Sequence, residues 1–403
     1  MRSVAPIKLY LDNSDYSVLS DPRVLTAETR AIRNQLLEWT STNVVVVFFS
    51  QALLTEMAPV SQGHESASRA RAELLYALCG RHTLFAQDRL IASELALLAT
   101  GDSHLRPSPY SSEGIWYPAG VDSLPEPFTS AELIEEAHRE IEIMGFNRAQ
   151  RRKATRTIQR NRSSLQGLVK REARTLDVSE EQAREGLSGY PLKPCELSLV
   201  IRYLATGDNL AEAQAAYRRS LCDPRWILDW MYMDIERSKA FAAMIREPGR
   251  TLCELMSSGI ATADQMRLIP HPSGAADHLS KNALSQQRID SIQRIASNIA
   301  LKVAGYQDAV TVDQLRDSCP GLYAMLGTSF SAWHASVEHN RKAPAPSDFG
   351  DALHALYAPY VDVFRADSSM AEHVKQHMPS GTSVVQKLKQ LIPTVEQIWS
   401  GRQ

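Results

Sequence analysis

The stretch SDFGDALHALYAPYVDVFRADSSM, residues 347–370, combines a short helix and a buried strand with acidic side chains at their ends. Apolar residues recur at helical spacing up to Tyr357, and Pro359 ends the helix because proline lacks the backbone N–H. The following run, Tyr360–Phe364, predicts a buried strand, and Asp367 lies just beyond it. Ligands of open α/β sheets bind at the carboxyl ends of the strands, so this stretch predicts a site as well as a fold.

Acidic residues open this helix as well as follow the strand. Asp348 and Asp351 occupy the start of the helix and, together with Asp367, would lie at one edge of a sheet. Taken singly, Asp348 or Asp351 is equally well explained as a helix N-cap, whose side-chain oxygen accepts a hydrogen bond from a free backbone N–H. The position of Asp367 after a strand favours a site.

The first hundred residues alternate strands with helices, which predicts a parallel sheet with helices on its faces. The strands are expected at Ile7–Leu11, Val44–Phe49 and Thr83–Phe85. The helices are expected at Leu25–Trp39, Ser66–Leu78 and Arg89–Leu98. A further helix is expected after Ser50, which is well suited to be its N-cap.

Three more acidic residues follow these strands closely. Asp12 and Asp15 come at the turn after the first strand, where they could cap a helix or hold a cation. Glu56 lies on the second turn of the helix that follows the second strand. A lone helical glutamate is usually a solvated surface residue, but the short distance from a buried strand favours a place near the strand ends.

A long helical region separates the two parts of the chain that carry strand patterns. Residues from about 130 to 341 contain helical patterns and no convincing strand, and a loop rich in Pro, Gly and Ser precedes them. The last strand is expected at Thr382–Val385 and the closing helix at Lys387–Trp399. We therefore expect one α/β domain, with halves at residues 1–105 and 344–403, interrupted by a large all-α insertion at residues 106–343.

The composition is that of an ordinary globular protein. The 403 residues are 44% hydrophobic and 22% charged, with a formal net charge of -2, so any nucleic-acid surface must be local. The N-terminus lacks the apolar run of a signal peptide, and the most apolar run is too short to span a bilayer. The five widely spaced cysteines contain no CxxC pair and indicate reduced thiols. A cytoplasmic protein without a membrane partner is expected.

The acidic residues after the strands predict a divalent-cation site. Carboxylates that converge on one point repel one another unless a cation neutralises them. Hard cations prefer oxygen ligands, and Mg²⁺ in particular uses a few carboxylates together with water and substrate phosphate. One or two such ions can support the in-line hydrolysis of a phosphodiester. Mg²⁺ or Mn²⁺ is therefore the expected cofactor.

Three segments together resemble the PIN-domain nuclease superfamily, and in particular a bacterial subgroup of PIN-like proteins. They are KLYLDNSD (residues 8–15), VVVVFFSQALLTE (44–56) and DALHALYAPYVDVFRAD (351–367). The resemblance covers about two-fifths of the chain and does not extend to the helical insertion. It implies a PIN-like parallel sheet flanked by helices and metal-dependent phosphodiester hydrolysis, usually of RNA.

The resemblance also implies which residues act. The metal-binding and catalytic acids would be Asp12, Glu56, Asp351 and Asp367. The secondary candidates for the metal are Asp15, Asp348 and Asp362. His354, one turn after Asp351, could orient an acid or a phosphate, and a packed, hydrogen-bonded histidine is an equally good explanation.

A basic stripe is the candidate nucleic-acid surface. It lies on the helix expected at residues 148–174, on which arginines recur at every fourth position: Arg148, Arg152, Arg156 and Arg160. Such a stripe can follow a phosphate backbone without sequence preference. The alternative is a solvated face that pairs with the acidic residues just upstream, between residues 132 and 142.

These observations favour a metal-dependent endoribonuclease, with RNA as the partner and single-stranded DNA as an alternative substrate. The helical insertion would serve substrate recognition, homo-oligomer formation or restraint of activity by an inhibitory partner. A toxin or defence role is a reasonable extension of this hypothesis. The alternatives are a non-catalytic PIN-like module that binds nucleic acid or protein, and a metal hydrolase acting on a small phosphate ester.

Overall fold

The computed structural model describes residues 4–59, 63–101, 108–127, 147–160, 189–243, 281–338 and 346–402, with a few single positions between residues 142 and 265. The contacts divide the chain into two compact units. One comprises Met1–Ala119 together with Leu228–Gln403, and the other comprises Gly120–Ile227. Every strand of the described residues lies in the first unit.

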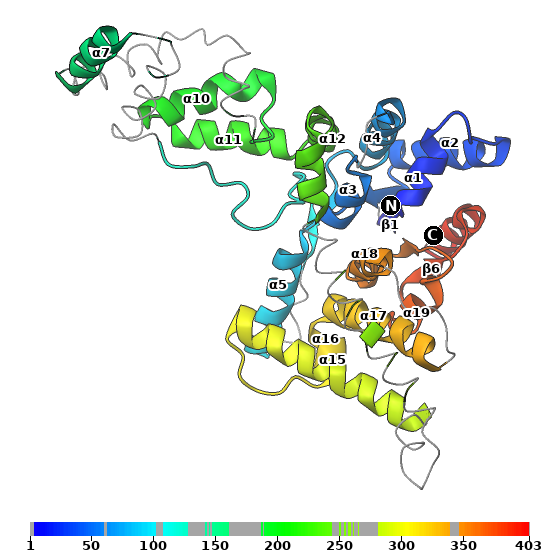
Figure 1. Cartoon of the computed structure of the whole chain (residues 1–403). Coiled ribbons are helices and arrows are strands. Elements are labelled where there is room, and N and C mark those ends of the chain that lie inside the picture. Colours follow the sequence, from blue (N-terminus) through cyan, green and yellow to red (C-terminus); the bar gives the residue numbers. More distant parts are fainter. Residues whose placement is uncertain are drawn as a thin grey trace. The chain divides into compact units, whose positions relative to one another are not determined.

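Four parallel strands form the main sheet in the order β2-β1-β5-β6. Figure 1 labels two of them, β1 close to the N-terminus and β6 close to the C-terminus. The strands are β1 (Ile7–Tyr10), β2 (Val45–Phe48), β5 (Val363–Arg365) and β6 (Ser383–Val385). Lys8 of β1 pairs with Val46 of β2, and Leu9 of β1 pairs with Val363 of β5. Strands from the two ends of the sequence thus share one sheet. The expected α/β class, with a parallel sheet flanked by helices, is confirmed.

Two short strands adjoin β2. The strands β3 (Thr83–Leu84) and β4 (Tyr110–Ser111) pair antiparallel, and a bridge between Phe49 and Thr83 connects them to the main sheet. The strand β4 lies in a stretch that the sequence predicts to be a loop. A strand of two residues among proline, glycine and serine leaves no periodic pattern to detect.

The N-terminal helices follow the strands as expected. They are α1 (Asn13–Ser20), α2 (Ala27–Ser41), α3 (Gln51–Met57), α4 (Glu65–Cys79) and α5 (Gln87–Thr100). Side chains of Asp12, Thr26 and Ser50 cap the beginnings of α1, α2 and α3. Helices α2 and α4 pack against β2, and α1 packs against α4.

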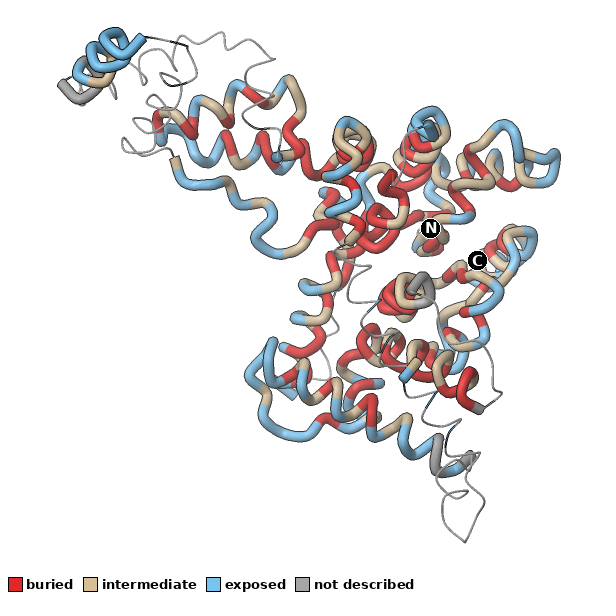
Figure 2. The backbone as a smooth tube through the Cα atoms, viewed as in Figure 1, coloured by how far each residue is buried: buried red, intermediate tan, exposed pale blue. Residues whose placement is uncertain are grey.

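The later helices of this unit are α15 (Lys281–Ala304), α16 (Val312–Ser318), α17 (Pro320–Glu338), α18 (Pro346–Ala355), α19 (Ala371–Lys375) and α20 (Leu391–Arg402). Helix α20 packs against β1, β5 and β6. Helix α17 contacts α5, α15, α16, α18 and α19 and is buried along much of its length (Figure 2). Helices α15–α17 therefore share a compact unit with the sheet, although they fall within residues 106–343. The expected boundaries of the insertion stay a prediction.

A buried carboxylate, Glu94 of α5, holds the beginning of α17. It accepts hydrogen bonds from the backbone N–H of Gly321 at 2.6 Å and of Leu322 at 2.9 Å, and from the hydroxyl of Tyr360. The N–H groups at the start of a helix lack intrahelical partners, so a buried start needs such an acceptor. Burial raises the pKa of Glu94 to about 7, although the three donors act in the opposite direction. Glu94 thus joins α5, α17 and the 3-10 turn Ala358–Tyr360.

The second unit contains helices and no strand among its described residues. The helices are α7 (Arg148–Arg160), α10 (Leu197–Thr206), α11 (Leu210–Leu221) and the beginning of α12 (Pro224–Met233). The indole N–H of Trp226 donates to the carbonyl of Pro191 at 2.8 Å, and Lys193 pairs with Asp223 at 2.7 Å. Residues 161–174 of the expected basic helix lie outside the described residues, as does most of the helix expected at 131–143.

The cysteines are free where the structure describes them. Cys79, Cys222 and Cys319 are buried and Cys195 is exposed, while Cys253 lies outside the described residues. Burial raises the pKa of the Cys79 thiol to about 12, which makes it a poor nucleophile. Among the described helices, none is long and apolar enough to cross a membrane.

The contact between α17 and the end of α18 predicts a stability effect at Gly321. A Cβ at this position would lie 2.6 Å from the Leu356 carbonyl oxygen and 2.7 Å from Oε1 of Glu94. Because backbone cannot yield cheaply, Gly321→Ala should lower the free energy of unfolding by about 1–3 kcal/mol in denaturant titrations. Gly381→Ala, where a Cβ would meet nothing within 4 Å, is the matched control and should change little. Equal stability of the two variants would contradict this packing.

Candidate metal centre

Asp12 lies at the carboxyl end of β1 and begins α1. Its Oδ2 atom accepts hydrogen bonds from the backbone N–H of Ser14 at 3.1 Å and from the Ser14 hydroxyl. The side chain of Asp15 accepts in return from the backbone N–H of Asp12 at 3.2 Å, which completes a capping box. Asp12 therefore does cap a helix, and this cap holds its carboxylate in place at the sheet edge without using Oδ1.

Glu56 reaches the same region from α3. Its side chain is 27% exposed, and Oε2 lies 3.2 Å from Nε2 of His354. The other oxygen, Oε1, lies against the backbone of α18, since a Cβ at Gly350 would be 2.8 Å from it. Glu56 is thus not the freely solvated surface residue that helical glutamates usually are. It is held between a histidine and a glycine of α18.

His354 is buried, and both of its ring nitrogens face polar atoms. Nδ1 lies 2.6 Å from the hydroxyl of Tyr10, which in turn lies 2.6 Å from the hydroxyl of Ser50. Burial alone would lower the pKa of His354, but attraction to Glu56, and then to Asp12 and Asp351, raises it to about 9. Contacts on both nitrogens fix the ring, so His354 is well placed to orient Glu56.

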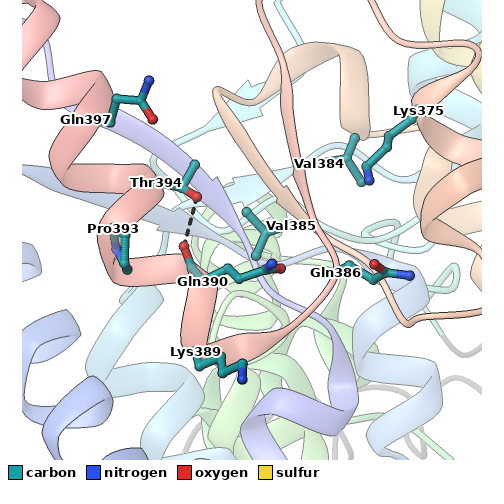
Figure 3. A pocket seen from close by; sticks show the side chains of 9 residues that line it. All are labelled: Lys375, Val384, Val385, Gln386, Lys389, Gln390, Pro393, Thr394 and Gln397. Carbon is teal, nitrogen blue, oxygen red and sulfur yellow. Dashed lines mark hydrogen bonds between the residues drawn. The ribbon is translucent and has the colours of Figure 1, made fainter.

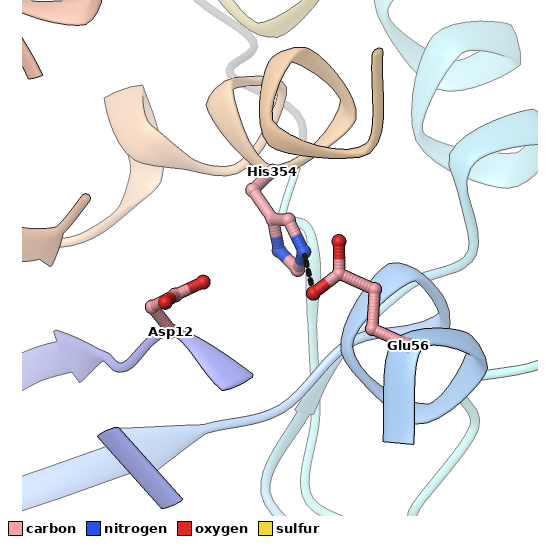
Figure 4. Close-up of side chains that lie close together, drawn as sticks. All are labelled: Asp12, Glu56 and His354. Carbon is pink, nitrogen blue, oxygen red and sulfur yellow. Dashed lines mark ion pairs between the residues drawn. The ribbon is translucent and has the colours of Figure 1, made fainter. Parts of the chain in front are cut away.

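The ligand atoms of Asp12, Glu56 and His354 lie within 4.8 Å of one another. Figure 4 shows the His354 ring pointing from α18 toward the Glu56 carboxylate on α3, with Asp12 to one side. Across the described residues, no other group of three or more His, Cys, Asp or Glu has its ligand atoms this close together.

Asp351 and Asp367 belong to the same acidic cluster. Burial raises the pKa of Asp351 to about 7, and the negative charges of Asp367, Glu56 and Asp12 add to the effect while His354 opposes it. Asp367, just past β5, accepts hydrogen bonds from the backbone N–H groups of Ser369 and Met370, each at 2.8 Å. The structure brings Asp12 and Glu56 together with His354, and Asp351 interacts electrostatically with Asp367, Glu56 and Asp12. The ligand roles of the four acids stay a prediction.

Two of the secondary candidates have other partners. Asp15 is buried and pairs with Arg365 at 3.2 Å; burial raises the pKa of Asp15 to about 7 despite this partner. Asp362 precedes β5, at the opposite end of the strand from Asp367. It accepts the backbone N–H of Lys8 at 2.7 Å and pairs with Arg402. Asp15 supports the turn that carries Asp12, whereas Asp362 stabilises the sheet.

The remaining candidates cannot be placed at this centre. Asp348 lies on α18, but its side chain is outside the described residues. Arg148, Arg152 and Arg156 are exposed on α7, in the unit that does not contain the acids; the side chain of Arg160 on the same helix is not described. The proposed role of this stripe in nucleic-acid binding stays a prediction.

Sequence reasoning missed three residues that shape the centre. Tyr10 and Ser50 support His354 through hydroxyl contacts, and Gly350 gives Glu56 room beside α18. Tyr10 is fully buried in an apolar strand, so its pattern indicates core packing and hides the polar contact. A glycine inside an otherwise helical segment was the available signal for close approach at Gly350.

Comparison of the chain with family profiles, with curated proteins and with solved structures found no match.

The donor set fits a hard divalent cation. Carboxylates such as those of Asp12 and Glu56 supply the oxygen ligands that Mg²⁺ and Mn²⁺ prefer. Burial first, and then the charges of Asp367, Glu56 and Asp12, raise the pKa of Asp351. The imidazole of His354 adds positive charge to the site when it is protonated. Its two ring nitrogens already contact Tyr10 and Glu56, so a metal ion bound to either nitrogen would replace one of these contacts. Asp12, Glu56 and His354 are therefore the residues that could hold a metal ion, and His354 could instead orient Glu56.

The close approach at Gly350 predicts a variant that separates metal binding from stability. Alanine at this position in α18 would displace the end of the flexible Glu56 side chain, while alanine is itself favourable in a helix. Gly350→Ala should therefore weaken Mn²⁺ binding about tenfold in calorimetric titration without lowering the melting temperature. Gly381→Ala should leave both unchanged. Unaltered Mn²⁺ affinity in Gly350→Ala would remove Glu56 from the ligand set.

The protonation of Asp351 predicts a pH-dependent effect of metal on stability. The folded state holds a proton on Asp351 between the ordinary pKa of 3.8 and about 7, so the metal-free protein should lose stability as pH rises through this range. Mg²⁺ bound by the ionised acids should then raise the melting temperature more at about pH 8 than at about pH 5. Asp15 and Glu94 have similar pKa values, so their ionisation also lowers the stability of the protein as pH rises.

The variant Asp351→Asn isolates the contribution of Asp351 from that of Asp15 and Glu94. It removes the proton-binding group and one ligand, so its pH profile should be flatter and its melting temperature should respond less to Mg²⁺. Differential scanning fluorimetry at several pH values measures both quantities. Identical profiles for the variant and the wild type would show that Asp351 does not titrate with the cluster.

Proposed function

We propose that this protein is a metal-dependent endonuclease that hydrolyses phosphodiester bonds, with RNA as the preferred substrate. The observation that carries the proposal is the close group of Asp12, Glu56 and His354, from distant parts of the sequence, together with Asp351, on which the charges of Asp367, Glu56 and Asp12 act. Such clusters of carboxylates are costly without a counter-ion and are suited to metal-assisted phosphoryl chemistry. The PIN-like motifs in the sequence add independent support.

Each residue of the centre would have a defined part. The four carboxylates would hold Mg²⁺ or Mn²⁺, which when bound stabilises charge on the phosphate and lowers the pKa of water. Asp12 is fixed by its cap to α1, and Asp367 by the N–H groups of Ser369 and Met370. His354 would keep Glu56 in position through the contact at 3.2 Å.

A non-catalytic binding module is the second candidate. The observation that favours it is His354, whose pKa of about 9 makes it a cation among the acids at neutral pH. An imidazolium at this position compensates part of the negative charge without any metal. A protein that uses the centre in this way would bind a partner but would not cut nucleic acid.

Cleavage of labelled single-stranded RNA and matched DNA, with Mg²⁺ or Mn²⁺, tests the proposal. Asp12→Asn and Asp367→Asn should reduce cutting to background, because a neutral amide is a poorer ligand for a hard cation. Both variants should stay folded, because asparagine caps a helix as well as aspartate does.

The matched control is Asp362→Asn, which alters an acid at the other end of β5 and should cut normally. Full activity in the Asp12 and Asp367 variants would refute the site. Cleavage by neither the wild type nor the control, with normal melting curves, would favour the binding module.

A further inference from the structure

A polar hollow lies beside the acidic cluster, at the same edge of the sheet. It has a volume of about 540 Å³ and is bordered by α19, by the end of β6 and by the segment from the 3-10 turn Leu388–Gln390 into α20 (Figure 3). The polar side chains that line it are Lys375, Gln386, Lys389, Gln390, Thr394 and Gln397. Because β5 and β6 are parallel, the end of β6 lies next to the turn that carries Asp367.

A hydrogen bond connects this hollow to the acidic cluster. The side-chain amide of Gln386 donates to the carbonyl of Ser368 at 3.1 Å, and Ser368 follows Asp367 directly in the chain. Gln386 therefore belongs both to the wall of the hollow and to the support of the Asp367 turn. A ligand in the hollow would lie beside the centre that the four carboxylates form.

The lining of the hollow is suited to an anion. It combines two ammonium groups with amides and a hydroxyl, and no carboxylate is among its described lining residues. The ammonium of Lys375 pairs with Glu372 at 2.8 Å, but both side chains are well exposed, so this pair is weak and can exchange for a phosphate. The hollow is open to solvent and most of its lining residues are polar, which favours an extended, charged ligand over a compact apolar molecule.

A second, smaller hollow continues the path toward Asp12. Its volume is about 290 Å³, and it shares Lys389 with the first hollow. Lys387 and Arg365 also line it, together with the acidic residues Asp15 and Glu28. Ser14, another lining residue, donates hydrogen bonds to Asp12. Arg365 is neutralised by Asp15, so the lysines supply the available positive charge.

We propose that the larger hollow binds the phosphate backbone of a single-stranded polynucleotide, with Lys375 and Lys389 contacting successive phosphates. The glutamine amides can donate to sugar or base oxygens, and Lys389, common to both hollows, leads the strand toward Asp12. The proposal rests on the function proposed above, since it assigns the substrate of that centre, but the binding itself requires no metal. This sequence-independent use of lysine predicts a strong dependence of affinity on salt.

The test measures binding without cleavage. A fluorescein-labelled single-stranded RNA is titrated with the full-length protein in chelator, and its anisotropy is followed at several salt concentrations. The double variant Lys375→Gln/Lys389→Gln removes two phosphate contacts, so the slope of log K against log salt should decrease by about 1.4, at about 0.7 for each contact. The same relation gives a loss of affinity of roughly 25-fold at about 0.1 M salt.

The matched control is Lys302→Gln on α15, which removes one exposed lysine from a helix that packs against α5, α16 and α17. It should leave the affinity and the salt slope unchanged. Failure of the wild type to bind the RNA, an unchanged slope in the double variant, or an equal loss in Lys302→Gln would each overturn the proposal.

A parallel cleavage assay with Mg²⁺ separates this proposal from that of the nuclease. If the wild type cuts RNA and the double variant binds and cuts it normally, the nuclease proposal stands. The proposal that the hollow binds RNA is then refuted. Binding that depends on the two lysines in a protein that never cuts would support the hollow and refute the nuclease.

Discussion

The pairing of β1 with β5 is the constraint on which the first unit depends. These strands come from opposite ends of the sequence, and their parallel alignment sets Asp12 and Asp367 at the same edge of the sheet. The backbone N–H of Lys8 donates to Asp362 across 354 residues, and Arg402 binds the other oxygen of the same carboxylate. One acidic residue thus secures the amino end of the paired strands while others gather at the carboxyl end. A carboxylate therefore holds the strands together at one end of the sheet, while other carboxylates lie at the opposite end.

Polar contacts inside the apolar core connect it to the acidic residues at the carboxyl end of the strands. Tyr10 is fully buried and stacks on Phe364, yet its hydroxyl meets Ser50 and His354. This chain of contacts fixes the His354 ring against Glu56. Buried polar groups are tolerated when each has a partner, and such a network holds a single arrangement of side chains. The core therefore supports the acids as well as the fold.

Much of this fold could be predicted from the sequence, because strands and helices of the sheet region carry strong periodicity and Ser50 and Pro359 mark local boundaries. The acids could be proposed as a group because each falls just after a strand or on the early turns of a helix, and Asp12 and Glu56 do lie close together. The residues that hold Glu56 and His354 in place could not be predicted. The contacts of Gly350 and Tyr10 depend on the approach of α18 to β1 and α3, which no local pattern encodes. The inclusion of α15–α17 in the unit that contains the sheet was equally hidden, because Glu94 and Gly321 meet only in the folded chain.

The position of β5 late in the sequence has a consequence for synthesis. A ribosome exposes β1 and β2 long before it reaches Val363, so the edge of β1 that β5 will occupy has no native partner until then. The carboxylates of Asp351 and Asp367 are likewise made long after Asp12. A nascent chain can therefore hold a partly formed sheet but not the complete acidic centre. Such a chain exposes an unpaired strand edge, which favours aggregation until β5 has been made.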